Sequence, residues 1–524
     1  MNGKVLMGAQ YVKNLAQILE ESSARFPDKV CLIYKNTSFT YKELNNLVNK
    51  AGNAFLNLGI KTGDRAMISL LNCPEFVISF FALAKIGAIS VPMNYLLTAN
   101  EEQYILNDSE VSLIITDCTK LSHFHKMTAG TIPVVITNHG ERDKILPDAV
   151  SFWTLIEKHS ELLSSCPCGR EDVVTILYTS GTTGRPKGAM LTHYSVMFCS
   201  SLYTDNDDTR EFFSEKARFL TSLPLYHCYG QNPCLITQLS IGATVILIEK
   251  FDTEKVLQAM TEHGATHFAG VPTMYAYLNS GFDPERHNVR SLEFCCSAGA
   301  ALSYEIAREF KGKTGVEIIE GYGITEASAQ ALVSPMKPHE RREDKFGSIG
   351  FPLKNSEQKT EARIVDEDGK EMPPDGVGEL IIKGDHLMRG YWKLPEETRQ
   401  TIRDGWLYTG DIAKKDEDGY FYIVDRKKDM IIVGGENVYP REIEEVLYQN
   451  EKILEAAVVG IKDAVKGESV RAVVALKNGF QTTEQELIDF CASRLAKFKV
   501  PRAIEIREGL PKSSTGKILR RLLK

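Results

Sequence analysis

The sequence predicts an α/β protein. We expect a large N-terminal domain of layered α/β sheets with a small β-barrel-like part, and a small mobile α+β C-terminal domain. Helical and extended patterns alternate up to about residue 321, short strands with Gly and Pro turns follow, and a smaller α+β pattern begins after about residue 429. A chain of 524 residues also exceeds one ordinary hydrophobic core.

The first third has the strand and helix order of a parallel sheet. Thr40 to Glu43 forms a capping box that opens an amphipathic helix running to Leu58, and Arg65 to Leu71 is a buried strand. The segments that continue this order are PEFVISFFALAKIG (helix), AISVPM (strand), EEQYILNDS (helix) and VSLIITD (strand). This βαβ order predicts helices on both faces of the sheet.

Two further blocks, from about Val173 to Glu249 and from Lys255 to Gly321, repeat the alternation. The segment EARIVDEDGKEMPPDGVGELIIKG then predicts an antiparallel barrel or sandwich. The five charged residues DRKKD mark a boundary, after which AAVVGIKD, RAVVALKN and a helix through ELIDFCASRLAKF form the small unit. We therefore expect a large domain over 1–425, a hinge at 426–428 and a small domain over 429–524.

Composition limits the partners and the compartment. A net charge of -7 offers no general attraction to nucleic acid, and eleven cysteines without a regular framework favour the reducing cytoplasm. The N-terminus lacks the apolar core of a signal peptide. The most apolar stretch, Phe76 to Met93, is broken by Lys85, Gly87 and Pro92, so no transmembrane segment is expected. Peripheral membrane contact and a homodimer remain open.

The strongest local signal is TSGTTGRPKG, from Thr179 to Gly188, directly after the apolar run VVTILY. Glycines and small hydroxyl residues let backbone N–H groups wrap around phosphate oxygens, and Lys187 adds positive charge. Pro186 stands where a P-loop requires glycine, so the kinase and GTPase interpretations lose their main support. A plain surface turn would not need this order of residues.

A second motif, GYGITEAS at 321–328, is similar to a dinucleotide-binding fingerprint, but Glu326 replaces its third glycine. A carboxylate there would repel a pyrophosphate unless it held a metal ion. Mg²⁺ takes few protein carboxylates and keeps water and phosphate ligands, so one glutamate suffices. The alternative is a solvated loop acid.

Further motifs follow in a fixed order: LPLYH at 223–227, YTGD at 408–411, DRKKDMIIVGGENVYPREIE at 425–444 and PKSSTGKILRR at 511–521. Together with the first two, they resemble the adenylate-forming superfamily of acyl-CoA synthetases, luciferases and peptide-synthetase adenylation domains, and fatty acyl-CoA synthetases most of all. The resemblance covers essentially the whole chain. It implies an enzyme that uses ATP and Mg²⁺ to activate a carboxylic acid as an acyl-adenylate and passes the acyl group to coenzyme A.

The resemblance also implies roles for individual residues. Thr325 would touch the α-phosphate, Tyr322 would stack on adenine, and Asp411 would accept the ribose hydroxyls with help from Arg426, although TGD is also a good turn. The implied magnesium residues are Thr182 and Glu326. The nucleotide- and CoA-binding set is Thr179, Ser180, Gly181, Thr182, Thr183, Gly184, Lys187, Gly299, Ala300, Ala301, Glu320, Gly321, Tyr322, Gly323, Asp411, Ile423, Arg426, Lys428, Gly434, Gly435 and Glu436.

Lys517 in STGK is the expected catalytic cation. Attack of a carboxylate on the α-phosphate brings two anions together, and a mobile ammonium between them lowers the barrier. In the family the small domain then rotates about the residue matching Lys428 and brings Gly434 to Asn437 to the thiol channel. Gly435 would line that channel because glycine lets a pantetheine arm pass close to the backbone. Alternatively, the glycine pair only ends a strand.

Sequence features near LPLYH bear on the acid substrate. His227 stands where amino-acid-activating relatives carry an aspartate, which argues against an α-amino acid, and by resemblance it borders the carboxylate end of the pocket. The expected walls are Cys228 to Gln231, Ala269 to Pro272 and Ser297 to Ala301, which are apolar with few charges. They suit a buried tail worth about 0.8 kcal/mol per CH₂. Medium- or long-chain fatty acids are favoured, with aryl acids as the alternative.

Other interpretations remain. The acceptor could be a carrier-protein phosphopantetheine, or the adenylate could be oxidised as in luciferases. A non-enzymatic nucleotide-binding role would require a broken catalytic set, yet Lys187, Glu326, Asp411 and Lys517 are all present. Two departures from the family pattern are Ala301, where many relatives have proline, and a segment at 354–366 that is a few residues longer than usual.

Overall fold

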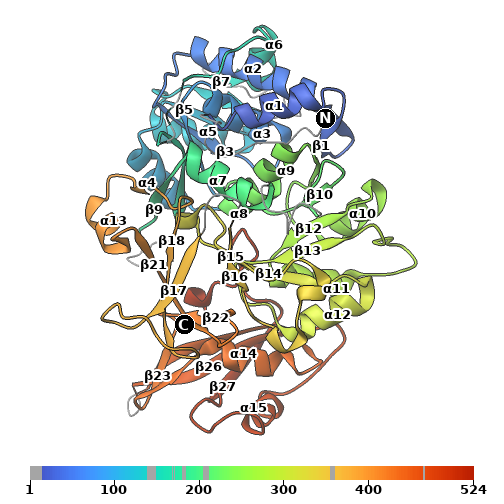
Figure 1. Ribbon diagram of the computed structural model, residues 1–524, viewed down its shortest axis with the longest axis vertical. Coiled ribbons are helices and arrows are strands. Elements are labelled where there is room, and N and C mark those ends of the chain that lie inside the picture. Colours follow the sequence, from blue (N-terminus) through green and yellow to red (C-terminus); the bar gives the residue numbers. More distant parts are fainter. Residues whose placement is uncertain are drawn as a thin grey trace.

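Two large, mainly parallel sheets build the upper part of the molecule in Figure 1, and a smaller unit lies below them. The computed structural model describes residues 14–137, 149–167, 169, 171–179, 185–204, 212–354, 360–463 and 467–524. The mixed α/β architecture with a large N-terminal and a small C-terminal part agrees with the predicted fold class.

The first sheet has eight strands in the order β19-β9-β8-β4-β3-β5-β6-β7. The strands from β8 to β7 in this order are parallel, and β9 and β19 are antiparallel additions at one edge. The strands are β3 (Arg65–Ser69), β4 (Ile89–Pro92), β5 (Leu113–Thr116), β6 (Val134–Ile136), β7 (Ala149–Ser151), β8 (Val173–Thr179), β9 (Lys187–Thr192) and β19 (Gly390–Tyr391).

The second sheet has nine strands in the order β16-β15-β14-β13-β12-β10-β11-β1-β2, with its six central strands parallel. Their carboxyl ends therefore lie along one edge. The strands are β1 (Val30–Tyr34), β2 (Thr37–Thr40), β10 (Arg218–Thr221), β11 (Thr244–Leu247), β12 (His267–Gly270), β13 (Phe294–Ser297), β14 (Ile318–Tyr322), β15 (Leu332–Val333) and β16 (Phe351–Pro352).

Helices of the large part join the two sheets into one core. The main apolar cluster combines Phe55, Phe80 and Leu239 from three helices with Ile68 of β3 and Val245 of β11. The helices of this part are α1 (Gln17–Arg25), α2 (Tyr41–Asn57), α3 (Pro74–Lys85), α4 (Ala99–Ser109), α5 (Cys118–Thr128), α6 (Phe152–Glu157), α7 (His193–Thr204), α8 (Cys228–Gln231), the π-helix η2 (Asn232–Ile236), α9 (Thr237–Ile241), α10 (Thr253–His263), α11 (Pro272–Gly281), α12 (Tyr304–Thr314) and α13 (Pro395–Thr401).

Sequence rules locate several of these elements well. The predicted capping box is present, since the Thr40 hydroxyl accepts from the Glu43 N–H and the Glu43 carboxylate accepts from the Thr40 N–H. The block from Val173 differs from the simple alternation that we expected. β8 and β9 form an antiparallel pair in which Thr179 faces Lys187, because the phosphate-loop motif connects them as a hairpin instead of a crossover helix.

Two smaller sheets complete the fold: one is antiparallel, and the C-terminal one is antiparallel apart from one parallel pair of strands. The predicted antiparallel region is a five-stranded sheet of β17 (Glu361–Val365), β18 (Val377–Lys383), β20 (Ile402–Arg403), β21 (Trp406–Lys415) and β22 (Phe421–Arg426). The C-terminal sheet contains β23 (Ile431–Val433), β24 (Glu436–Val438), β25 (Ile453–Asp463), β26 (Gly467–Leu476) and β27 (Ala503–Arg507), packed with α14 (Pro440–Tyr448) and α15 (Glu484–Ala492). Between the two sheets, residues 427–429 form a turn, at the position of the expected hinge.

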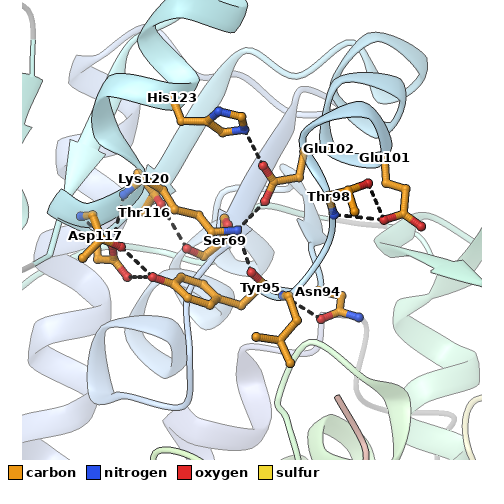
Figure 2. A network of polar contacts seen from close by, with 12 residues as sticks. Ser69, Asn94, Tyr95, Thr98, Glu101, Glu102, Thr116, Asp117, Lys120 and His123 are labelled. Atoms are coloured by element: carbon orange, nitrogen blue, oxygen red, sulfur yellow. Dashed lines mark hydrogen bonds and ion pairs between the residues drawn. The ribbon is translucent and has the colours of Figure 1, made fainter. Parts of the chain in front are cut away.

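A buried acid at the carboxyl edge of the first sheet stabilises the loop after β4 (Figure 2). Glu102 of α4 is 2% exposed and is paired with Lys120 and, at 2.6 Å, with Nε2 of His123. Lys120 Nζ also donates to the Tyr95 carbonyl at 2.6 Å, and the Tyr95 hydroxyl donates to Asp117 at 2.6 Å. The network therefore holds Tyr95 of this loop against the start of α5 and ties α4 to α5.

The helices in the described part of the chain include none that is both long and apolar enough to cross a membrane.

Replacing Lys120 with Met should destabilise the large part by about 3 kcal/mol, because it leaves the Glu102 carboxylate buried with one fewer partner. Urea-induced unfolding would measure the loss. The matched control is Lys414→Met, which breaks a pair with Asp375 whose side chains are 39% and 58% exposed, and should cost less than about 1 kcal/mol. Equal losses in the two variants would contradict a stabilising role for the buried network.

Candidate active site

Several of the predicted site residues lie at the carboxyl edge of the second sheet, near β21 and β22 of the five-stranded antiparallel sheet and the C-terminal segment. Tyr322 ends β14, and the exposed loop Gly299 to Ala301 follows β13. Gly321 lies beside Cys296 of the neighbouring strand. Gly323 has no room for a side chain, because a Cβ there would lie 1.7 Å from the Ala329 carbonyl oxygen. This close approach folds the loop that carries Thr325 and Glu326.

The residues predicted to hold the nucleoside form one contact group. The Tyr322 hydroxyl donates to Asp411 Oδ2 at 2.6 Å, and Arg426 Nε lies 3.5 Å from Asp411 Oδ1. Asp411 and Arg426 face each other across β21 and β22, and Asp411 is 6% exposed. Burial and the Asp411 charge raise the pKa of Tyr322, which keeps its hydroxyl a donor. The Asp411 carboxylate thus contacts both the Tyr322 hydroxyl and the Arg426 guanidinium.

Residues from the C-terminal segment reach this group. Lys517 follows Gly516, whose carbonyl accepts from the Thr273 hydroxyl at 2.7 Å, and the Lys517 N–H donates to the Ser513 hydroxyl at 3.1 Å. Loss of solvent and, next, Arg426 lower the pKa of Lys517 to about 7, while Asp411 acts the other way. No carboxylate of the described residues lies within 4.0 Å of the Lys517 ammonium. Lys517 therefore has no direct ion-pair partner among the described residues, and its charged form is disfavoured by burial.

His227 faces the same cation. Its Nδ1 accepts from the Tyr229 N–H at 3.2 Å, which leaves the proton of a neutral imidazole on Nε2. Burial and the Lys517 charge lower the pKa of His227 to about 4, so the ring is neutral at pH 7. Cys228 Sγ lies 3.5 Å from the Thr325 hydroxyl and connects the His227 segment to the loop after β14.

The predicted walls of an acid pocket also meet. One apolar cluster joins Tyr229 to Ala269, Val271 and Ala298, one or more residues from each of the three predicted wall segments. Met274 belongs to the same cluster and lies near Gly516. Apolar surface therefore begins beside His227 and Lys517.

Glu320, another predicted nucleotide residue, lies at the junction with the small unit. It is 7% exposed and accepts from the Leu302 N–H at 3.3 Å. Burial raises the pKa of Glu320 to about 7, Arg441 opposes this, and Glu445 adds to it. Its side chain thus holds the loop after β13 and faces α14.

Other predicted residues lie elsewhere or outside the described chain. Ser180, Gly181, Thr182, Thr183 and Gly184 fall outside the described residues, while Thr179 and Lys187 pair at the base of their loop. Gly434 and Gly435 form the exposed two-residue turn between β23 and β24, both with positive φ, as a type I′ hairpin requires. Glu436 and Lys428 are exposed, and Ile423 accepts from the Arg441 guanidinium through its carbonyl.

Three residues that hold site residues or the C-terminal segment in place were not predicted from the sequence. Tyr391 donates to Glu326 Oε1 at 2.8 Å, Thr273 binds the Gly516 carbonyl, and Arg520 binds Glu444 at 2.7 Å and Asp425 at 3.2 Å. The described residues hold no cluster of three or more His, Cys, Asp or Glu side chains suited to a metal ion. A metal ion at this site would therefore be coordinated by few side chains of the described residues. Arg520 lies within the motif PKSSTGKILRR, but the motif assigned it no role, and no local motif included Tyr391 or Thr273.

Comparison with known proteins gives consistent results. A family model described as AMP-binding enzyme matches residues 19–392, and one described as AMP-binding enzyme C-terminal domain matches residues 442–517. A long-chain-fatty-acid--CoA ligase of Bacillus subtilis (strain 168) is 37% identical, with 98% of this chain and 94% of the relative covered. A crotonobetaine/carnitine--CoA ligase of Salmonella agona (strain SL483) is 34% identical over 98% of this chain and 99% of its own.

Solved structures are similarly close. The anthranilate CoA ligase AuaEII in complex with anthranoyl-AMP superposes with a TM-score of 0.89 at 30% identity, over 99% of this chain and 98% of the other. A benzoate CoA ligase from Burkholderia xenovorans LB400 gives a TM-score of 0.86 at 28% identity, over 98% of this chain and the whole of the other.

The lowered pKa of Lys517 predicts how docking of the C-terminal segment depends on pH. A free lysine has a pKa of about 10.4, so the docked segment binds fewer protons between about pH 7 and pH 10. Docking in the nucleotide-free protein should therefore strengthen as the pH rises through this window. Hydrogen exchange of amides 512–519, corrected for intrinsic rates, would measure it. Lys517→Met should abolish the dependence, and an unchanged dependence in that variant would refute the assignment.

Proposed function

The chain belongs to the AMP-binding enzyme family and is an acyl-CoA synthetase-type ligase, and from this premise we propose that it makes acyl-CoA from a free carboxylic acid through an acyl-adenylate. ATP supplies the adenylate, coenzyme A is the acceptor, and AMP and pyrophosphate leave. The observation that carries the proposal is the meeting of Lys517 with His227 on one side and with Asp411 and Arg426 on the other.

In the first step a carboxylate oxygen attacks the α-phosphorus of ATP, and the bond to the pyrophosphate oxygen breaks. The Lys517 ammonium would bridge the two anions, and their charge would raise its pKa and keep it protonated. The Tyr322, Asp411 and Arg426 group would orient the ribose. His227, with its proton on Nε2, can donate to the acid without adding a competing charge.

Mg²⁺ fits this donor set as a cofactor. Glu326 offers one carboxylate, of which Oε1 is already bonded to Tyr391, and the phosphates supply the remaining oxygen ligands that the ion prefers. Glu326, with Thr182 from the phosphate loop, would hold the ion. Bound there, it would neutralise charge on the phosphates.

In the second step the thiol sulfur attacks the acyl carbonyl carbon, its proton passes to solvent, and AMP leaves with the electrons of the broken bond. We propose that the small unit turns about the segment at Lys428, which withdraws Lys517 and brings the Gly434–Gly435 turn to the adenylate. That turn is exposed in the present arrangement.

The favoured substrate is a medium- or long-chain fatty acid. The apolar cluster around Tyr229 and Val271, together with the likeness to a long-chain-fatty-acid--CoA ligase, supports this choice. Aryl acids are the second candidate, because Tyr229 and Phe219 in that cluster offer aromatic surface and the similar structures include anthranilate and benzoate CoA ligases.

A panel of acids with ATP and coenzyme A held constant tests the function and the substrate class. We expect release of AMP and pyrophosphate that rises with alkyl chain length over medium chains, by roughly threefold to fourfold in kcat/KM per CH₂ while the pocket holds the added carbon. Preference for benzoate or cinnamate would select the aryl alternative. Absence of pyrophosphate exchange with every acid would refute the proposal.

Two variants should separate the half-reactions. Lys517→Ala should slow pyrophosphate exchange by roughly a hundredfold or more, because it removes the bridging cation, and should spare thioester formation from supplied acyl-adenylate. Gly435→Leu should do the reverse by crowding the thiol approach. Rapid-quench assays of each half-reaction measure both effects. Equal damage to both steps in both variants would contradict the two-conformation mechanism.

A further inference from the structure

Tyr391 lies between two groups that come from different sheets. Its hydroxyl donates to Glu326 Oε1 at 2.8 Å, and the Lys187 Nζ lies over its ring, 5.3 Å from the centroid. Glu326 belongs to the 3-10 helix η3 (Thr325–Ala327) after the second sheet, whereas Lys187 begins β9 in the first. One side chain thus contacts both the acid and the cation of the two phosphate-handling loops.

The position of Tyr391 is tightly constrained. In the antiparallel pair of β19 and β9 it faces Ala189, and its N–H donates to the Thr398 hydroxyl at 2.9 Å. The preceding Gly390 has φ of 145°, and a Cβ there would lie 2.7 Å from the Thr398 methyl carbon. Only 8% of Tyr391 is exposed. The ring is therefore a fixed platform and not a mobile surface group.

The direction of the hydrogen bond is equally well defined. The Tyr391 phenol donates its proton, and the Glu326 carboxylate, which has only acceptor oxygens, accepts it. The Glu326 carbonyl is fixed separately, because it accepts from the Met388 N–H at 2.8 Å. Glu326 is therefore held at two points, through its backbone carbonyl and through Oε1 of its carboxylate.

We propose that Tyr391 is a positioning residue that aligns the Glu326 carboxylate for a metal ion and holds Lys187 for the phosphates, so that the two loops engage metal-bound ATP as one unit. This inference rests on the proposed function. The two parts of the side chain have separate roles. The hydroxyl aligns the Glu326 carboxylate for the metal ion, and the ring holds Lys187 for the phosphates.

Two substitutions separate these tasks. Tyr391→Phe removes the hydroxyl and keeps the ring beneath Lys187, whereas Tyr391→Leu removes both. Isothermal titration calorimetry would measure the affinity for ATP in two conditions, with excess Mg²⁺ and with EDTA, in the absence of any acid. Binding without turnover keeps the measurement independent of activity.

For Tyr391→Phe we expect affinity for ATP with Mg²⁺ to fall about tenfold, since the carboxylate loses a hydrogen bond to a charged group, and affinity in EDTA to stay unchanged. For Tyr391→Leu we expect the EDTA affinity to fall as well, by roughly threefold to tenfold, because the lysine loses its ring. Equal affinities of Tyr391→Phe and wild type with Mg²⁺, or an equal loss in both conditions, would overturn the inference.

Tyr34 provides a matched control at the far side of the second sheet. Its hydroxyl donates to Glu249 Oε1 at 2.9 Å, and Lys35 Nζ lies 4.8 Å from its ring centroid. Tyr34→Phe removes the same chemistry away from the site and should leave both affinities unchanged. Thermal unfolding of each variant reports any loss of folding. If Tyr391→Leu does not fold, the ATP affinities of Tyr391→Phe with Mg²⁺ and with EDTA still test the inference.

Pyrophosphate exchange by the wild-type enzyme keeps this inference distinct from the proposed function. If wild type exchanges pyrophosphate but Tyr391→Phe binds Mg²⁺-ATP as wild type does, the role of Tyr391 is refuted and the ligase function stands. If wild type does not exchange with any acid, the proposed function itself is refuted.

Discussion

The placement of one ammonium group, that of Lys517, is the constraint on which the rest of the structure depends. The group lies among Arg426 and a neutral His227, without a carboxylate of the described residues in ion-pair contact, and its pKa is lowered accordingly. Such a position is costly in the empty protein and becomes favourable when an anion arrives. The electrostatic penalty is what makes the site selective for a negatively charged ligand.

Polar and apolar contacts together hold the small unit onto the large one, and Tyr448 and Leu454 of the small unit pack against an apolar cluster of the large part. The Thr273 hydroxyl binds the Gly516 carbonyl, Lys512 donates to the Tyr277 hydroxyl at 3.1 Å, and Lys477 lies 3.4 Å from Glu309. Arg520 fixes the C-terminal segment to Asp425 at the end of β22, and Figure 1 shows the chain end returning to this strand. Polar contacts of this kind can be broken and remade at low cost, which is compatible with the proposed rotation of the small unit.

The active site straddles two independent sheets, and this explains the need for a connecting residue. The phosphate-loop lysine extends from the first sheet, while Glu326 and Tyr322 follow β14 of the second. Small shifts between packed layers would misalign the acid and the cation. Tyr391 lies in the antiparallel extension of the first sheet and contacts both Glu326 and Lys187. It would therefore keep these two side chains at a constant distance when the sheets shift.

The sequence by itself determined the α/β alternation and the capping box at Thr40, and it supplied the motifs from which the site residues were predicted, because each depends on residues close together in the chain. It could not reveal the antiparallel pairing of β8 with β9, the Tyr391 to Glu326 hydrogen bond across 65 positions, or the anchoring of Arg520. Those features arise from contacts between segments far apart in the chain. Only the packing of the sheets and the docking of the C-terminal segment, which set burial and charge around Lys517 and His227, decided how these groups act together.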